Sequence, residues 1–252
     1  MLKLVDICKT FNPGTNNEKV ALNHLNLTLA PGDFVTVIGG NGAGKSTIIK
    51  SIIGFLRFDG QIEIDGFPCK SIAAKRLIGY VPEIPALYPN LTVSEHMEFV
   101  ARAYRLNGYK EYIDELFDRF ELTDKKKKFG DELSKGMQQK LNICLGLLPR
   151  PKLLLFDEPM IGLDPHAIKE LKLIFEEIRS EGRSIFVSTH MIDSIDMLWD
   201  RTIILKKGKV CANVTREALD KSGATLEQLF FKVTESNIST SEKIDGNEEC
   251  AK

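Results

Sequence analysis

Four glycines fall within six residues of the segment GGNGAGKST, which spans positions 39–47. Glycine loses more backbone freedom on folding than any other residue, so this density indicates a need for bare main chain. Gly39, four further residues, and then Gly44, Lys45 and Ser46 fit the phosphate-loop spacing G-x-x-x-x-G-K-[ST]. In such a loop main-chain N–H groups wrap phosphates, the lysine reaches the β- and γ-phosphates, and the serine binds Mg²⁺. The residues expected to bind the nucleotide are Gly39, Gly40, Asn41, Gly42, Ala43, Gly44, Lys45, Ser46 and Thr47.

The segments on either side of this loop agree with that interpretation. Upstream, FVTVIGG (34–40) is a short apolar run rich in β-branched residues, which predicts a buried strand. Downstream, STIIKSIIGFL (46–56) places apolar residues at helical spacing. A helix that begins at the loop would add its N-terminal dipole to phosphate binding. The alternative, a glycine-rich turn that happens to precede Lys-Ser, requires both flanks to agree by chance.

A pair of adjacent acids follows a second apolar strand, in the segment LLLFDEP. An enzyme that hydrolyses a nucleotide needs an acid near Mg²⁺, and Asp157 at the strand end suits that role. It also needs a group that orients or deprotonates the attacking water, and Glu158 suits that role. The alternative is an ordinary strand end with two solvated acids. The phosphate loop favours the functional interpretation.

Composition limits the class of protein. The chain has 252 residues, of which 43% are hydrophobic, and a formal net charge of −1. This length allows one large α/β domain or two small ones, and the low charge argues against a generic nucleic-acid binder. The N-terminal MLKLVDICKT lacks the long apolar region of a signal peptide, and no apolar run approaches the roughly 20 residues that cross a bilayer. Widely spaced cysteines favour reduced thiols over metal or disulfide roles. They are Cys8, Cys69, Cys144, Cys211 and Cys250.

The pattern along the chain predicts strands towards both ends and helices between them. The predicted strands span residues 2–7, 20–30, 34–40, 61–66, 77–83, 152–158, 184–190 and 201–210. The predicted helices span residues 46–56, 92–106, 109–122 and 135–148. The last stretch, rich in Ser, Glu and Asn from about residue 235, predicts a disordered tail.

Three short motifs complete a recognisable order. LSKGM (133–137) precedes a helix, GLDP (162–165) follows the two acids, and STH (188–190) ends the next strand. With the phosphate loop as Walker A and residues 153–157 as Walker B, residues 1–230 resemble an ATP-binding-cassette (ABC) ATPase. This resemblance implies an α/β fold: a P-loop NTPase core with a mostly parallel sheet, an N-terminal antiparallel β subdomain and a helical insertion at about residues 84–150. It implies one ATPase domain at residues 1–232 and a polar tail at residues 233–252.

The resemblance also implies roles for individual residues, with ATP and Mg²⁺ as the bound groups. Glu158 matches the catalytic glutamate and His190 the switch histidine. Phe11 falls where the family places an aromatic ring on adenine, although a core or strand-end role remains open for it. The D-loop residues are Gly162, Leu163 and Asp164. The implied metal ligands are Ser46, Glu83 and Asp157. The signature residues that act on the partner's ATP are Ser134, Lys135, Gly136 and Met137.

Three positions, in two motifs, depart from the family pattern. The usual signature is Leu-Ser-Gly-Gly-Gln, whereas Lys135 and Met137 replace a glycine and the glutamine here. Ser134 and Gly136 are retained, and Lys135 would add positive charge near the partner's γ-phosphate. Glu83 stands where the family has a glutamine, which adds negative charge near the γ-phosphate. Slower hydrolysis and a stronger dependence on coupling are both consistent with that charge.

The segment YVPEIPALYPNLTVSEHMEF (80–99), together with LSKGM, resembles the ATPase subunits of bacterial exporters of the Ecs and bacitracin-resistance kind. In this family the signature of one subunit closes the ATP site of the other, so the resemblance implies a second copy of the chain or a paralogous ATPase. It also implies a separate integral-membrane permease, with this chain peripheral at the cytoplasmic face of the bacterial cell membrane. No nucleic-acid partner is expected.

Several alternatives stay open from sequence alone. A non-transport ABC ATPase that acts as an assembly or scaffold factor carries the same motifs. Apolar residues after Glu83 either form a groove for a helix of the permease or pack the helical insertion. These residues are Ile84, Leu87, Tyr88 and Leu91. The basic run at residues 125–128 is either a solvated loop or a contact for anionic lipid headgroups.

Overall fold

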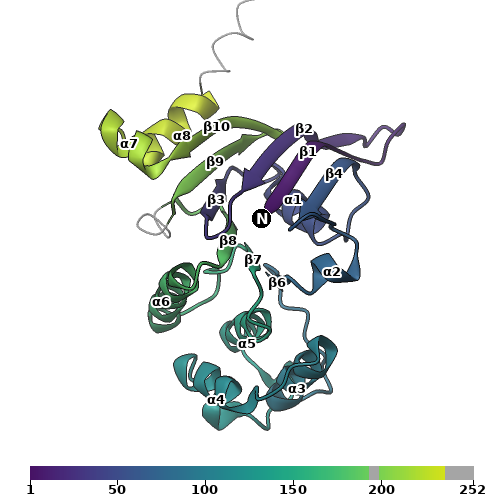
Figure 1. Cartoon of the computed structure of the whole chain (residues 1–252), viewed down its shortest axis with the longest axis vertical. Helices are drawn as coiled ribbons and strands as arrows, with labels where there is room; N and C mark the ends of the chain where they lie inside the picture. Colours follow the sequence, from purple (N-terminus) through teal and green to yellow (C-terminus); the bar gives the residue numbers. More distant parts are fainter. Residues whose placement is uncertain (193–198, 236–252) are drawn as a thin grey trace, which may run out of the picture.

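A computed structural model describes residues 1–192 and 199–235 of the chain, which form two sheets with helices between and around them (Figure 1). The larger sheet has six strands in the order β10-β9-β3-β8-β7-β6. All neighbouring strands in it are parallel except β10 and β9. Its strands are β3 (Phe34–Ile38), β6 (Ile78–Val81), β7 (Leu153–Asp157), β8 (Ser184–Thr189), β9 (Arg201–Lys206) and β10 (Lys209–Thr215).

The smaller sheet is antiparallel, in the order β2-β1-β4-β5. Its strands are β1 (Leu2–Phe11), β2 (Lys19–Leu29), β4 (Asp59–Ile64) and β5 (Phe67–Pro68). Towards its C-terminal end β2 alternates buried and exposed residues, as expected of a strand with one face towards solvent. In contrast β3, β7 and β8 are buried at every residue, which is typical of parallel strands covered on both faces. The predicted mostly parallel core and antiparallel subdomain are confirmed.

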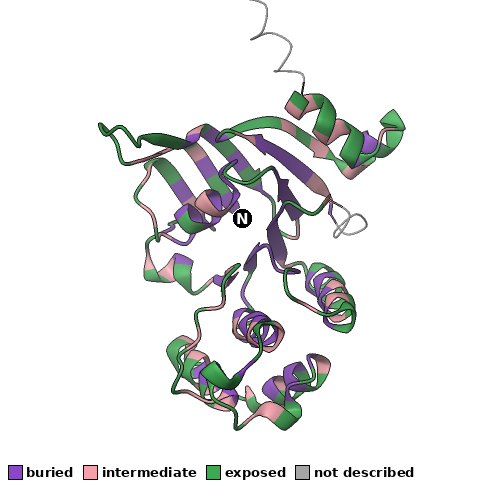
Figure 2. Ribbon diagram, turned by 180° about the vertical axis from the view of Figure 1, so that it is seen from behind, coloured by how far each residue is buried: buried purple, intermediate pink, exposed green. Residues whose placement is uncertain are grey.

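Helix α1 (Lys45–Ile52) lies between the two sheets. Its Ile48, Ile49 and Ile52 belong to one buried cluster with apolar residues of β1, β2 and β4 and of the six-stranded sheet. On the other face of the large sheet, α6 (Pro165–Ser180) brings the Phe175 ring edge-on to Phe34 and Phe156, at 5.4 and 5.0 Å between centroids. The buried residues therefore concentrate along the central strands and the inward faces of these helices (Figure 2).

The helical insertion contains α3 (Val93–Tyr104), α4 (Lys110–Arg119) and α5 (Lys135–Leu147), with 3₁₀ turns η1 (Thr123–Lys125) and η2 (Gly130–Glu132). Helix α3 begins with a capping box in which the Thr92 hydroxyl accepts from the Glu95 N–H and the Glu95 carboxylate accepts from the Thr92 N–H. Its buried side chains join the same cluster as α6 and β7, so the insertion shares its core with the large sheet. The remaining helices are α2 (Ile72–Lys75), α7 (Arg216–Ser222) and α8 (Leu226–Glu235). No helix in the described ranges is long and apolar enough to span a membrane.

Three local predictions need correction or completion. Residues 201–210, predicted as one strand, form the hairpin β9–β10, because Lys207 and Gly208 take positive φ values of 48° and 75° and reverse the chain. Helix α6 was not predicted, although Asp164 caps it and Pro165 opens it. Helix α8 extends into the predicted tail as far as Glu235, and residues 236–252 lie outside the described part.

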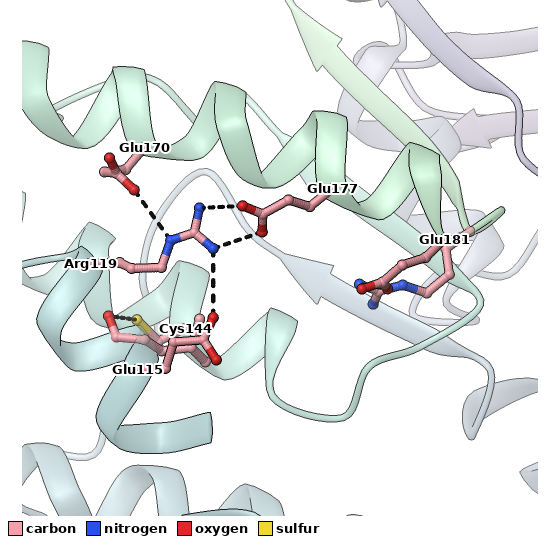
Figure 3. A network of polar contacts seen from close by, with 8 residues as sticks. Glu115, Arg119, Cys144, Glu170, Glu177 and Glu181 are labelled. Atoms are coloured by element: carbon pink, nitrogen blue, oxygen red, sulfur yellow. Dashed lines mark hydrogen bonds and ion pairs between the residues drawn. The ribbon is translucent and has the colours of Figure 1, made fainter. Parts of the chain in front are cut away.

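An ion-pair network joins the helical insertion to α6 (Figure 3). Arg119 of α4 donates from Nη1 and Nη2 to both carboxylate oxygens of Glu177 on α6, at 2.7 and 2.9 Å. Its Nε donates to Glu170 of α6 at 3.2 Å, and Glu115 lies 3.8 Å from Nη1. The Arg119 side chain is only 19% exposed, so its charge depends on these partners. Hydrogen bonding to Glu177 outweighs the opposing effect of burial and raises the pKa of the guanidinium.

We expect Arg119→Met to lower the free energy of unfolding by about 1–2 kcal/mol, because it leaves Glu170 half-buried without its cation. Urea unfolding at pH 7 measures the change. The matched control is Arg102→Met, which removes a 77% exposed arginine from its pair with Glu98 on α3 and should cost less than about 0.5 kcal/mol. Equal effects of the two substitutions would contradict a special role for the Arg119 network.

Candidate nucleotide-binding site

The loop between β3 and α1 presents an open helix N-terminus. Gly44 is the N-cap residue of α1, at φ 112°, and no side chain caps the helix or places an acid in its first turn. A Cβ on Gly44 would lie 2.6 Å from the carbonyl oxygen of Ala21, so only glycine fits. An uncapped N-terminus carries unpaired N–H groups and the positive end of the helix dipole, which together bind anions.

Lys45 contacts both the start of the phosphate loop and the second acid after β7. Its Nζ donates to the main-chain oxygen of Gly39 at 2.8 Å and lies 3.4 Å from Oε1 of Glu158. The side chains of Lys45 and Glu158 are 7% and 6% exposed. A buried ammonium group is costly unless an anion lies beside it. The Glu158 carboxylate is that anion here, and a bound phosphate would supply another.

The last residue of β7 lies against the first turn of α1. Asp157, which is buried, accepts a hydrogen bond from the Ser46 hydroxyl at 3.0 Å and another from the Ser188 hydroxyl of β8. A hydroxyl and a carboxylate at this distance form an oxygen donor set that fits Mg²⁺. Glu83 lines the same cleft and could add a third oxygen donor. Ser46 and Glu83 thus line one cleft, and Asp157 contacts Ser46; metal binding by these three residues stays a prediction.

Glu158 has an unusual backbone conformation, with a φ of 49°. Its N–H still donates to the main-chain oxygen of Ser188 at 2.9 Å, so it stays attached to the end of β8. The carboxylate accepts from the His190 N–H at 3.2 Å, and its Oε1 lies 3.0 Å from His190 Nδ1. A non-glycine residue in the left-handed region is uncommon, and such residues concentrate at functional sites.

These elements enclose a cleft of approximately 350 Å³. Phe11 lines it, as the base-stacking prediction requires, and so does His190. Gly39 and Gly40 form the beginning of the loop but are not among the lining residues. The lining residues are Phe11, Lys19, Ala21, Asn41, Gly42, Ala43, Gly44, Lys45, Ser46, Thr47, Glu83, Glu158 and His190.

The signature and the D-loop lie next to each other, outside this lining. The hydroxyl of Ser134 caps α5 by accepting from the Met137 N–H at 3.3 Å. A Cβ on Gly136 would be 3.0 Å from the carbonyl oxygen of Gly162, so the two segments pack closely. Ser134, Lys135 and Gly162 are exposed and Leu163 is half-buried. The predicted residues thus form two separate surfaces within one chain.

Sequence reasoning missed a lysine behind the signature. Lys140 of α5 is buried, and its Nζ lies 2.7 Å from Asp164 and 3.1 Å from Glu121. Burial alone would lower the pKa of Lys140, but its hydrogen bonds to Asp164 and Glu121 outweigh burial and raise it. The hydrogen bond between Lys140 and Asp164 is also the main cause of the lowered pKa of Asp164. The only available signal was a charge on the otherwise apolar face of the 135–148 helix.

Comparisons with known proteins agree with this geometry. The sequence model of a family described as "ABC transporter" matches residues 22–161. The ABC-type transporter ATP-binding protein EcsA of Bacillus subtilis (strain 168) is 37% identical over 222 residues, which cover 84% of this chain and 90% of that protein. The bacitracin transport ATP-binding protein BcrA of Bacillus licheniformis is 33% identical over 242 residues, or 94% and 76% of the two chains.

Solved structures show the same similarity. An ATP-binding subunit of an ABC transporter superimposes with a TM-score of 0.85 at 34% identity, covering 93% of this chain and 99% of that one. A dimeric ATP-binding cassette, in a post-hydrolysis state bound to ADP and Pi, has a TM-score of 0.77 at 27% identity, with coverage of 85% and 98%.

We expect Lys45→Ala to weaken ATP binding by about a hundredfold or more, because the charged hydrogen bonds from Nζ to the phosphates are lost. Titration with a fluorescent ATP analogue in the presence of Mg²⁺ measures the affinity. Lys50→Ala, in the last turn of the same helix, removes an exposed lysine and serves as the control. Near-native affinity in the Lys45 variant would disprove the phosphate-loop assignment.

Proposed function

The chain belongs to the ABC transporter family as an ATP-binding ATPase subunit, and from this membership we propose that it dimerises around two ATP molecules and powers a separate membrane permease. The observation that carries the proposal is the meeting of Lys45, Asp157 and Glu158 at one cleft, although they come from two segments more than a hundred residues apart in the sequence. The named relatives are transporter ATP-binding proteins, which supports transport over a scaffold role.

In the proposed site the nucleotide spans the cleft from Phe11 to the phosphate loop. The Phe11 ring would stack on adenine, and the N–H groups of the loop, with Lys45, would bind the phosphates. Ser46 and Asp157, with Glu83, would hold Mg²⁺, whose charge would offset the negative charge on the β- and γ-phosphates. This arrangement accounts for the oxygen donors and the ammonium group that the cleft brings together.

Glu158 is the proposed general base for hydrolysis. Its carboxylate would accept a proton from the attacking water, while His190 orients that carboxylate and contacts the γ-phosphate. The 3.0 Å contact between His190 Nδ1 and Glu158 Oε1 supports this pairing. Binding of phosphate near Lys45 would draw the ammonium group from Glu158 and free the carboxylate for the water.

A second subunit would complete each ATP site. The N-terminus of α5 is exposed at Ser134 and Lys135, so its N–H groups and positive dipole can face a γ-phosphate held by another chain. Lys135 would add a full positive charge there. The dimeric form of a solved relative supports this arrangement, and the partner is either a second copy or a paralogous ATPase.

We place the permease contact at an apolar groove of approximately 390 Å³ between the large sheet and the insertion. Of the four residues predicted to form such a groove, Leu87 lines it and also packs on the insertion's core, whereas the other three are not among its lining residues. Ile84 and Tyr88 are exposed, while Leu91 is half-buried. Phe55, which is 74% exposed, lines the same groove and meets the Tyr80 ring edge-on at 6.2 Å. Such a groove fits one amphipathic helix and would hold the chain at the cytoplasmic face of the membrane.

We expect Glu158→Gln to retain ATP binding and to lower turnover by about a hundredfold or more, because the amide keeps the shape but cannot accept the proton. Phosphate release measures turnover, and size-exclusion chromatography with ATP should show accumulated dimers. His190→Ala should also impair turnover. Glu181→Gln, on the exposed end of α6, is the control. Wild-type hydrolysis by the Glu158 variant would exclude it as the base.

We expect Phe55→Asp to reduce the fraction of the chain that sediments with membranes from its native bacterium, because a carboxylate in an apolar groove opposes docking. ATP binding should persist, which separates docking from folding. Leu173→Asp, an exposed position on α6 outside the groove, is the control and should sediment like the wild type. Unchanged sedimentation of the Phe55 variant would place the permease contact elsewhere.

A further inference from the structure

Lys19, the first residue of β2, lies at the phosphate loop although it belongs to none of the family motifs considered above. It lines the nucleotide cleft. Its Nζ is 3.2 Å from the position that a Cβ on Gly42 would take, so the ammonium group touches the turn of the loop. Lys45 reaches the same loop from α1, and the two lysines therefore come from different elements.

The position of Lys19 is fixed by strand pairing. In the antiparallel β1–β2 ladder Lys19 is directly opposite Phe11, and directly opposed residues have neighbouring side chains. Phe11 lines the cleft on the side proposed for the base. One cross-strand pair, Phe11 and Lys19, thus places an aromatic ring and a cation side by side at the cleft.

Lys19 differs from Lys45 in how its charge is neutralised. Within residues 1–192 and 199–235 it forms no ion pair with a carboxylate, whereas Lys45 is paired with Glu158. Two further positive features lie near the cleft: the Lys9 Nζ is 5.0 Å from the centre of the Phe11 ring, and the N-terminus of α1 carries the positive end of its dipole. The cleft also holds the carboxylates of Glu83 and Glu158, and Glu158 is paired with Lys45. Several positive groups around one cleft attract a polyvalent anion.

We propose that Lys19 is a second phosphate-binding lysine, whose ammonium group contacts oxygens of the phosphate chain of the bound nucleotide from the β2 side of the loop. This rests on the ATP binding proposed above. Its location at Gly42 directs it to the phosphates rather than to the base. Lys19 therefore favours nucleotides with two or three phosphates over the nucleoside, and contributes to affinity without taking part in proton transfer.

The test compares Lys19→Met, which keeps the length of the side chain without its charge, with Lys19→Arg, which keeps the charge. Affinities for ATP, ADP and adenosine are measured by displacement of a fluorescent ATP analogue with Mg²⁺ present. We expect Lys19→Met to bind ATP and ADP about five- to tenfold more weakly at low salt, with adenosine unchanged. Lys19→Arg should retain most of the ATP affinity. The control is Lys3→Met, an exposed lysine at the far end of β1.

Ionic strength gives a second readout that a structural role of Lys19 would not change. An exposed cation is screened by salt, so the difference between wild type and Lys19→Met should shrink as salt rises from about 0.05 to 0.5 M. Unchanged ATP affinity in Lys19→Met, an equal loss for adenosine, or a loss that salt does not reduce would each overturn the proposal. Failure of the ATP-binding proposal itself would look different, because Lys45→Ala and wild type would then bind ATP equally.

Discussion

The buried carboxylate of Glu158 is the constraint on which the site depends. It lies 3.4 Å from Lys45 Nζ and 3.0 Å from His190 Nδ1, and almost no water reaches it. A buried charge is stable only beside partners, so β3, β7 and β8 must end at the same edge of the sheet. Parallel pairing achieves this, because the carboxyl ends of neighbouring parallel strands coincide. The phosphate loop, the two acids and the histidine meet because each lies at the carboxyl end of one of these strands.

The helical insertion is tied to α6 by two further cations, of which Lys140 is buried and Arg119 is half-buried. Arg119 joins α4 to α6, and Lys140 joins α5 to the start of α6 through Asp164. Both reach α6, the helix that directly follows the D-loop. Because Gly136 also packs on Gly162, the signature and the D-loop lie directly against each other. Any rotation of the insertion relative to the sheet must rearrange these ion pairs together, so they favour discrete orientations over a continuous range.

Local patterns predicted most of the site because its chemistry is local. The spacing from Gly39 to Ser46 and the acids after β7 need no knowledge of the fold, and the confirmed family assignment follows from them. Lys19 could not be found this way, since its place in the cleft depends on the register that opposes it to Phe11. Lys140 was missed because its partners, Glu121 and Asp164, lie outside its own helix and only the fold brings them together. The β9–β10 turn has an ordinary turn signal in Lys207 and Gly208, but the apolar run before it suggested a single strand. Helix α6 has ordinary start signals in Asp164 and Pro165, which were interpreted only as part of a motif.

Tyr80 links the proposed nucleotide cleft to the proposed docking groove. Its ring lines the groove beside Phe55, while burial and then the carboxylates of Asp157 and Glu83 raise its pKa. The phenol therefore stays neutral at physiological pH, and the groove keeps an uncharged wall close to the acids. Glu83 follows Tyr80 by three residues, in the segment that leads to Leu87. A helix that moves Leu87 would pull on the same short segment that positions Glu83. If the groove and the cleft are used as proposed, the short segment after β6 is enough to connect the permease mechanically to the nucleotide.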